Sequence, residues 1–275
     1  DKMNPSFFFH WADKNNHIIR GWREIIDGEF RILSIPEAHQ LIGYYCIADK
    51  QKDILKVCRS YQYTAIRAIV NRVAKQKWGD HNQLGGFVWC TTGGGKTMTS
   101  FKAGQLIIDR KYADKVVFLV DRKSLDNQSS KEYDSFAPVG REVVKTKSAS
   151  DLFNKLVSSK SGNEMLLTSI QKISNITDEK EAKRKDELEI IKRKRIVFIV
   201  DEAHRSQFGE MHQNVKHTFY NALFVGFTGT PIFPENMREG EMTTESVFGR
   251  CLAVYSLATG IRDGNVLGFY PKGVK

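Results

Sequence analysis

The sequence lacks any long run of hydrophobic residues. Its longest uninterrupted apolar runs, such as VVFLV (116–120) and IVFIV (196–200), have five residues, whereas a membrane-spanning helix needs about 20. The sequence therefore predicts no spanning helix and no membrane partner. The N-terminus shows no secretory signal peptide. Because the chain opens on Asp-Lys-Met and stops without a tail, we interpret it as a piece excised from a longer protein.

Cysteine is scarce and scattered. The four cysteines are Cys46, Cys58, Cys90 and Cys251, and no two of them form a Cys-x-x-Cys pair. This spacing gives neither a zinc site nor a dense disulfide framework. It is typical of a protein of the reducing cytosol.

Acidic residues are outnumbered by basic ones. The chain has 32 Asp and Glu against 42 Lys and Arg, a formal net charge of +10, which favours a polyanionic partner without establishing one. The segment 178–195 is charged at all but four of its positions, with both signs mixed. We interpret it as a solvated helix or a surface excursion. The alternative is that its basic end, Lys192 to Arg195, contacts a phosphate backbone.

Five short apolar runs recur along the chain, and helix-length segments fill most of the gaps between them. The runs are 85–89, 116–120, 165–168, 196–200 and 222–226. Such runs bury both faces of a strand, as in a parallel sheet covered by helices. We therefore expect an α/β fold with a mostly parallel sheet sandwiched by helices. An amphipathic helix is predicted over 61–76, while residues 1–58 show no strong period.

A glycine-rich stretch, Thr92-Gly93-Gly94-Gly95-Lys96-Thr97, lies between the first run and a helix-like segment, MTSFKAGQLII. Glycines in series cost conformational entropy, so something must need a close backbone approach. A phosphate-binding loop offers backbone N–H groups, a lysine for the β- and γ-phosphates and a hydroxyl for Mg²⁺. The strict pattern G-x-x-x-x-G-K-[ST] would place glycine at Cys90, so this is the shorter form T-G-x-G-K-T. A flexible glycine turn is the alternative.

Two adjacent carboxylates, Asp201 and Glu202, follow the run IVFIV. A parallel strand would deliver them to the carboxyl edge of the sheet, where the phosphate loop also lies. There Asp201 is expected to hold Mg²⁺ through its water shell and Glu202 to orient and deprotonate the attacking water. The alternative is a helix N-terminus that favours acids.

The segment FTGTP (227–231) follows the last of the runs. It brings the hydroxyls of Thr228 and Thr230 to the same sheet edge, where we expect them to hydrogen-bond His204 or Glu202. A simple Gly-Thr-Pro turn is the alternative.

TGGGKT, DEAH and TGTP, in this order and spacing, resemble motifs I, II and III of superfamily 2 helicases and translocases. More closely, the sequence resembles the motor (restriction) subunit of type I restriction–modification enzymes. The matching segments are TTGGGKTMTSFKAG, VVFLVDRKSLDNQ, TSIQKI, DEAHRSQFGE, GFTGTPIFPEN and TTESVFGR. The extensions RSQFG and PIFPEN are not general helicase features, and the similarity runs along most of the chain.

The resemblance implies a role for each matching residue. The ATP-binding residues would be Arg59, Gln62, Thr92, Gly93, Gly94, Gly95, Lys96 and Thr97, with Gln62 at the position that reads adenine. The catalytic residues would be Lys96, Asp201, Glu202 and His204, with Thr97 and Asp201 at the Mg²⁺. Thr228, Gly229 and Thr230 would couple the nucleotide state to the DNA side. Family members often have proline at Ser60 and histidine at Cys90, and neither departure removes a catalytic group.

The resemblance also implies contacts with the DNA backbone. They would come from Asp121, Arg122 and Lys123 in motif Ia and from Thr168, Gln171 and Lys172 in motif Ib. Phosphate contacts of this kind fix position without reading sequence. Ordinary capping of strand ends is the alternative for these polar residues.

Taken together, the resemblance implies a RecA-like first motor lobe over residues 59–275 and a linking segment over 1–58. It implies ATP and Mg²⁺ as cofactors, double-stranded DNA and the methyltransferase and specificity subunits as partners, and the bacterial or archaeal cytoplasm as location. The parent would couple ATP hydrolysis to DNA translocation before cleavage. We expect the second lobe, with its arginine fingers, and the nuclease to be missing here, so that this chain turns ATP over weakly or not at all. The alternatives are another superfamily 2 DNA or RNA motor, and a nucleotide-dependent DNA-binding module without turnover.

Overall fold

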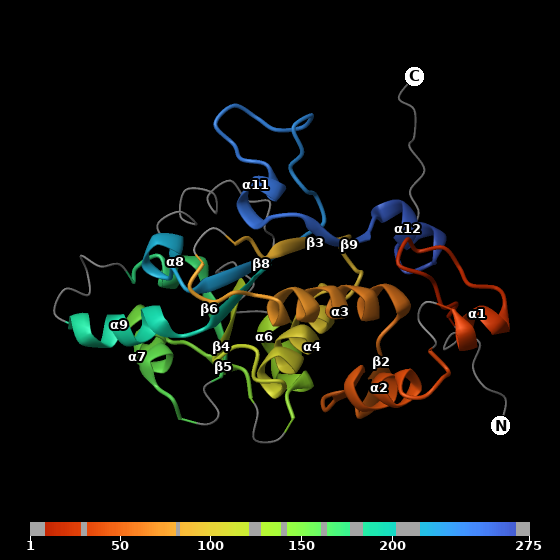
Figure 1. Cartoon of the computed structure of the whole chain (residues 1–275), viewed down its shortest axis with the longest axis horizontal. Helices are drawn as coiled ribbons and strands as arrows, with labels where there is room; N and C mark the ends of the chain where they lie inside the picture. The colour runs from red at the N-terminus through yellow and green to blue at the C-terminus, as the bar shows by residue number, and fades with distance from the viewer. Residues whose placement is uncertain are drawn as a thin grey trace.

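The computed structural model describes residues 9–28, 32–80, 83–120, 128–138, 142–160, 164–176, 184–201 and 215–267. Its centre is a seven-stranded sheet in the order β5-β6-β4-β7-β8-β3-β9, whose neighbouring strands all pair in parallel (Figure 1). The strands are β3 (Gly86–Cys90), β4 (Lys115–Val120), β5 (Val144–Lys145), β6 (Met165–Ser169), β7 (Ile196–Val200), β8 (Ala222–Thr228) and β9 (Cys251–Tyr255). The predicted parallel sheet is thereby confirmed.

Successive residues of the central strands point to opposite faces of the sheet and enter two separate cores. In β4, Val116, Phe118 and Val120 belong to one buried cluster, whereas Val117 and Leu119 belong to the other. Because both faces are apolar, helices cover both. The first core is covered by α3 (Ser60–Ala74), α4 (Lys96–Asp109) and α6 (Gln128–Phe136), and the second by α7 (Ala149–Val157), α8 (Ile170–Ile173), α9 (Lys185–Arg193) and α11 (Thr244–Phe248).

Two strands of the main sheet, β5 and β9, are missing from the sequence prediction, and both lie at the edges of that sheet. β5 has only two residues, too few to form a pattern. β9 is only partly buried, and Val254 is its one β-branched residue, so it resembles the buried strands less. The predicted helix over 61–76 is confirmed as α3, which ends at Ala74.

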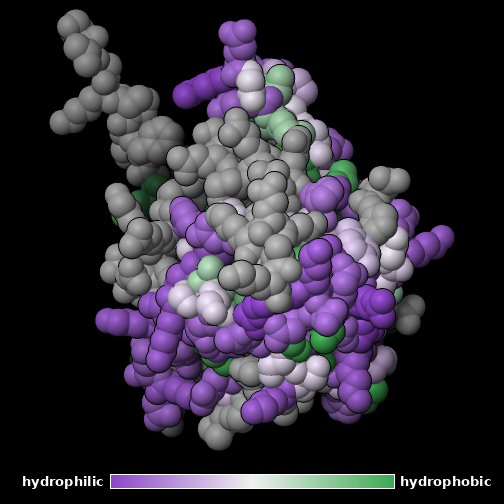
Figure 2. Space-filling view, turned by 90° about the vertical axis from the view of Figure 1, so that its left-hand side faces the viewer, coloured by the Kyte–Doolittle hydropathy of each residue, from purple (hydrophilic) through white to green (hydrophobic). Residues whose placement is uncertain are grey.

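The highly charged segment forms a surface helix where the structure describes it. Leu188 and Ile191 are the buried residues of α9, and the charged residues of this helix lie outward. Figure 2 shows the face that carries this end of the molecule, and the residues coloured there are mostly hydrophilic. Part of the segment, 178–183, lies outside the described residues. Among the described helices, none is long and apolar enough to cross a membrane.

Residues before α3 pack against helices α3 and α6 on one side of the main sheet and contact its edge strand β9. They form α1 (Trp22–Asp27), α2 (Glu37–Tyr44) and an antiparallel pair of strands, β1 (Cys46–Asp49) and β2 (Ile54–Val57). Tyr45 and Ile47 are buried in the same core as Tyr63 of α3. Nearer the N-terminus, the side-chain amide of Asn16 donates to the carbonyl of Val254 at 2.7 Å.

A buried carboxylate joins this N-terminal part to α6. Asp49 is almost fully buried, accepts a hydrogen bond from Ser135 at 2.8 Å and forms an ion pair with Lys56 at 2.7 Å. Burial raises its pKa, but the hydrogen bonds from Lys56 and Ser135 outweigh that effect and lower the pKa to about 2. The charged form of Asp49 therefore stabilises the contact.

Candidate nucleotide site at the carboxyl edge of the sheet

The glycine-rich loop joins β3 to α4, as the sequence predicts. Gly93 and Gly95 have φ values of +81° and +74°, in the left-handed region that favours glycine. Gly94 has an ordinary φ but no room for a side chain, because a methyl group there would lie 2.7 Å from Sγ of Cys90. The loop therefore needs glycine for conformation at two positions and for space at the third.

The first helical residues after this loop meet the end of β7. Lys96 and Thr97 line a small cavity together with Asp201, which directly follows β7. Asp201 is fixed at the sheet edge because its backbone N–H donates to the carbonyl of Leu119 in β4 at 2.9 Å. Three residues from two motifs about a hundred positions apart thus share one site. A hydroxyl and a carboxylate are hard oxygen donors, which suit Mg²⁺.

The charges of Lys96 and Asp201 both act on the thiol of Cys90. Burial raises the pKa of the Cys90 thiol to about 12; the nearby ammonium of Lys96 opposes this rise and the carboxylate of Asp201 reinforces it. Cys90 is therefore a neutral thiol at physiological pH. It packs beneath the glycine loop and carries no charge into the site.

Two further residues line the cavity that the sequence motifs do not single out. The hydroxyl of Ser100 lies 2.9 Å from that of Tyr133 and donates to the carbonyl of Thr97 at 3.0 Å. Burial, with the charge of Asp201 adding to it, raises the pKa of Tyr133, which stays neutral. Ser100 lies one helical turn after Thr97, so its place was readable from the sequence. Tyr133 comes from α6, and no local pattern indicates that it reaches the site.

The segment after β8 packs against the glycine loop. A methyl group on Gly229 would lie 3.4 Å from the carbonyl oxygen of Cys90 and 3.6 Å from the amide nitrogen of Thr92. The indole N–H of Trp89 donates to the carbonyl of Gly229 at 3.1 Å. The side chain of Thr228 is fully buried and accepts a hydrogen bond from the backbone N–H of Thr230 at 3.1 Å. The two motifs are therefore in direct contact.

Gln62 lies against the glycine loop from the side of α3. Its Oε1 accepts a hydrogen bond from the backbone N–H of Arg59 at 2.9 Å. Its Nε2 would lie 2.4 Å from a methyl group on Gly95, so the amide covers that glycine closely. Arg59 in turn donates to the side chain of Asn265. The structure thus brings Gln62 to the glycine loop and links Arg59 to the segment after α12 (Leu257–Arg262).

A second cavity, of about 280 Å³, opens beside Arg59. Its walls come from the N-terminal segment, the start of α3 and the end of α12, and include Phe9, Tyr61, Asp263 and Asn265. The ring of Tyr61 stacks on that of Tyr255, with centroids 3.5 Å apart and planes 9° from parallel. This aromatic pair is another feature that the sequence motifs do not indicate.

The predicted DNA-contacting residues differ in their surroundings. Thr168 is fully buried and its hydroxyl accepts a hydrogen bond from Thr146 at 2.7 Å. Lys172 donates to the carbonyl of Thr146 at 2.7 Å and is half-buried, while Gln171 is exposed. Of this set, Gln171 and Lys172 offer surface to a partner and Thr168 does not. Asp121, Arg122, Lys123, Glu202 and His204 lie outside the described residues.

Comparison with known proteins identifies a family along most of the chain. Residues 61–273 match the family model of the SWI2/SNF2 ATPase. The SauCOLORF180P endonuclease subunit of a type I restriction enzyme from Staphylococcus aureus (strain COL) is 40% identical over 268 residues, which are 98% of this chain and 27% of that relative. The chain therefore spans about a quarter of that relative's length.

A second relative is shorter, and the match covers nearly all of its length. It is the C-terminal part of the putative type I restriction enzyme MpnIIP endonuclease subunit from Mycoplasma pneumoniae (strain ATCC 29342 / M129 / Subtype 1). It is 36% identical over 213 residues, covering 76% of this chain and 99% of that relative.

Solved structures share the fold at low sequence identity. A nuclease-deletion mutant of the Type ISP restriction-modification enzyme LlaGI, in complex with a DNA substrate mimic, aligns with a TM-score of 0.56 at 18% identity over 76% of this chain and 21% of that chain. The UvsW helicase from bacteriophage T4 aligns with a TM-score of 0.52 at 14% identity over 79% of this chain and 67% of that chain. The chain thus has a helicase-like, RecA-type fold.

Proposed function

The chain belongs to the family of type I restriction enzyme endonuclease subunits and carries a SWI2/SNF2 ATPase domain, and from this premise we propose that it is the first, ATP-binding motor lobe of such a subunit. Residues 59–275 form the lobe in this proposal. Residues 1–58 link it to the rest of the subunit and, where described, pack on it through Tyr45 and Ile47. The observation that carries the proposal is the meeting of Lys96, Thr97 and Asp201 around one cavity.

We assign a task to three residues of this cavity, Lys96, Thr97 and Asp201, and to Glu202, which follows Asp201 in the chain. Lys96 binds the β- and γ-phosphates, and the phosphates lie on the N-terminus of α4, where free N–H groups and the helix dipole favour anions. Thr97 and Asp201 hold Mg²⁺, which supplies charge neutralisation for phosphoryl transfer when bound. Glu202 orients the attacking water and accepts its proton. These assignments are supported by the left-handed φ values of Gly93 and Gly95, which leave the backbone open to a phosphate.

The base and ribose of ATP extend toward α3 in this proposal. Gln62 covers Gly95, and Arg59 lines the cavity of about 280 Å³ beside Tyr61. That cavity is lined by Tyr61, the residue before Gln62, and has the aromatic and polar walls that a nucleoside needs. Thr228, Gly229 and Thr230 pass the nucleotide state to the DNA side together with His204. The contact between Gly229 and the backbone of Cys90 and Thr92 supports this coupling.

The longer subunit would use ATP hydrolysis to translocate double-stranded DNA in the cytoplasm, together with methyltransferase and specificity subunits. The net charge of +10 supports a nucleic-acid partner. Lys172 and Gln171 are the described residues proposed to contact the DNA backbone, with Asp121, Arg122 and Lys123 from motif Ia. Arginine fingers from a second lobe would complete the ATPase site, since no arginine is among the described residues that line the cavity of Lys96 and Asp201.

Calorimetry with ATP and Mg²⁺, beside a turnover assay with and without long duplex DNA, tests the proposal. We expect ATP binding with little turnover, because arginine fingers are worth roughly 10³ to 10⁵ in rate. The variant Lys96→Ala should abolish ATP binding while circular dichroism and thermal unfolding stay as in the parent chain. Lys172→Ala is the matched control, expected to weaken DNA binding and leave ATP binding unchanged. Undiminished ATP binding by Lys96→Ala would refute the assigned site. Brisk DNA-stimulated turnover would refute the proposal that a second lobe must complete the ATPase site.

A further inference from the structure

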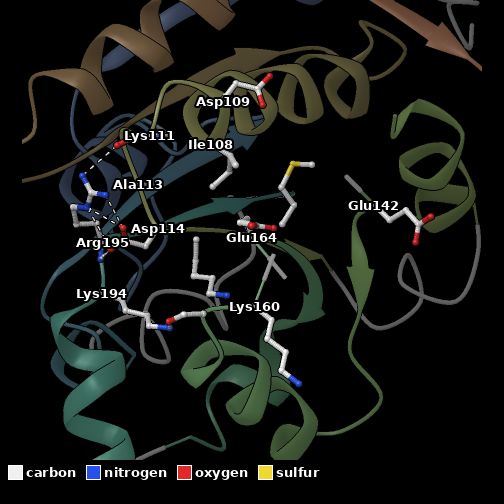
Figure 3. A pocket seen from close by; sticks show the side chains of 13 residues that line it. Ile108, Asp109, Lys111, Ala113, Asp114, Glu142, Lys160, Glu164, Lys194 and Arg195 are labelled. Carbon is white, nitrogen blue, oxygen red and sulfur yellow. Dashed lines mark hydrogen bonds and ion pairs between the residues drawn. The ribbon is translucent and has the colours of Figure 1, made fainter. Parts of the chain in front are cut away.

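A large cavity lies at the opposite edge of the sheet from the proposed nucleotide site. Its volume is about 610 Å³, and its walls come from the residues just before β4, β5, β6 and β7 and from the ends of α4 and α7 (Figure 3). The strands are parallel, and β4 spans six residues, about 20 Å at 3.3 Å per residue. A ligand in this cavity would therefore not overlap a nucleotide at Lys96.

The cationic wall of the cavity is held in place by backbone and ion-pair contacts. The ammonium of Lys194 donates to three carbonyls at the end of α7: those of Leu156 at 2.9 Å, Val157 at 2.7 Å and Ser158 at 3.1 Å. Arg195 forms an ion pair with Asp114 at 2.6 Å. These carbonyls take up the three ammonium hydrogens and carry only the partial negative charge of a helix end, so they offset the charge of Lys194 in part and an anion would meet Lys194 through its remaining charge.

Lys115 opens β4 and is the most deeply buried charged residue of this cavity, with 2% of its surface exposed. Burial and, to a smaller extent, the charge of Lys194 lower its pKa, while Glu164 and Asp114 oppose the fall, and together these effects place the pKa at about 8. Two ammonium groups thus line one cavity, and the charge of one acts on the other. An anion bound between them would relieve their repulsion and raise the pKa of Lys115.

The charged groups of the lining do not all face inward. Besides Lys115, they are the cations Lys111, Lys160, Lys194 and Arg195 and the carboxylates Asp109, Asp114, Glu142 and Glu164. Figure 3 shows the side chains of Asp109, Glu142 and Lys160 extending away from the centre. Lys111 is exposed to solvent, and Arg195 forms an ion pair with Asp114, which leaves Lys115 and Lys194 against Glu164 in the interior. The interior therefore carries an excess of positive charge.

An apolar wall completes the cavity. Met165 and Ala113 are buried, and Ile108 lies beside them in the lining. The volume is within the range of roughly 300 to 1,000 Å³ that is usual for small-molecule sites. We propose that this cavity binds a small organic anion, whose carboxylate or phosphate group lies between Lys115 and Lys194 and whose apolar body packs on Met165, Ala113 and Ile108.

Titrations with benzoate and with phenyl phosphate test this site. They are done by calorimetry at pH 7 in the Lys96→Ala background, so that the phosphate loop does not compete for the anion. We expect at least one probe to bind with a Kd of about 1 mM or tighter. Phenyl phosphate alone would identify a phosphate ester as the ligand class, and benzoate alone a carboxylate. Binding of neither probe would overturn the proposal.

Substitutions then locate the bound anion. Lys115→Met should weaken binding at least tenfold, whereas Lys160→Met, a lysine of the same lining that extends away from the centre, should leave it unchanged. Lys115→Met removes a buried group, and a loss of binding could then come from a loss of the fold. The variant Glu164→Gln therefore tests the site through a gain of affinity. Removing that inward carboxylate should tighten binding severalfold, which a misfolded chain cannot do. Equal affinities for all three variants would overturn the assignment.

The pH dependence gives a separate check on the same groups. Above pH 8 the free chain loses the proton of Lys115, so affinity should fall between pH 7 and pH 9. The Lys115→Met variant should show no such fall. A pH profile that is the same in both chains would contradict the role of Lys115.

Discussion

Replacing Gly94 by alanine tests whether the loop requires glycine for space alone. Gly94 has no positive φ, so alanine is not strained by conformation. Its methyl group would nevertheless lie 2.7 Å from Sγ of Cys90, 3.1 Å from the carbonyl oxygen of Thr91 and 3.2 Å from the ring of Tyr255. Carbon atoms in contact normally lie roughly 3.5–4.0 Å apart, so the loop must move away from β3.

The expected effect is that of overpacking a rigid site. Cys90 is buried in the sheet and cannot withdraw, so Gly94→Ala should lower the free energy of unfolding by about 1–3 kcal/mol. For a chain of this size that corresponds to a fall of roughly 2–4 °C in the midpoint per kcal/mol. ATP affinity should fall at least tenfold, because the displaced loop also carries the N–H groups proposed to bind phosphate.

A double-mutant cycle separates the clash with sulfur from other effects. Cys90→Ala removes the sulfur, so Gly94→Ala should cost less in that background, with a coupling energy of about 1 kcal/mol or more. Chemical denaturation of the four chains measures it. A loss below about 0.5 kcal/mol for Gly94→Ala, the range usual for surface changes, or no coupling with Cys90, would refute the steric argument.

Three other predictions concern separate parts of the molecule. In the longer subunit, Glu202→Gln should retain ATP binding and lose hydrolysis; unchanged turnover would exclude Glu202 as the base. Asp49→Asn should destabilise the chain by about 1–2 kcal/mol. Since the pKa of Asp49 is lowered from 3.8 to about 2, this contribution is present above pH 4 and is lost as pH falls toward 2, so unfolding curves of the two chains should converge there. Tyr133→Phe should lower the free energy of unfolding by about 1 kcal/mol, because Ser100 loses a buried hydrogen-bond partner. A change within the error of the measurement would show that Ser100 finds another partner.

The strands and the glycine-rich loop between β3 and α4 were predictable because their signals are local. Five-residue apolar runs such as 116–120 and 196–200 can be buried only between two helical layers, and the sheet confirms them. The order of strand, glycines, lysine and helix lies in one short stretch of sequence, so the conformation of this loop could also be predicted locally. The edge strand β9 was missed because it is partly exposed and has little β-branching, so its identity depends on pairing with β3, about 160 residues earlier.

The sequence by itself determined the fold class, the family and the residue types at the proposed nucleotide site, since each is encoded in short contiguous patterns. The meeting of Asp201 with the glycine loop was also expected, but the tertiary structure decided the detailed contacts and several meetings of distant residues that no motif indicated. It brought Tyr133 from α6 beneath Thr97, placed Gln62 over Gly95 and buried Thr168. It also assembled Lys115 and Lys194 at the amino edge of the sheet. These groups are far apart in the chain, and the strand pairing that joins them is a long-range choice that no local pattern specifies.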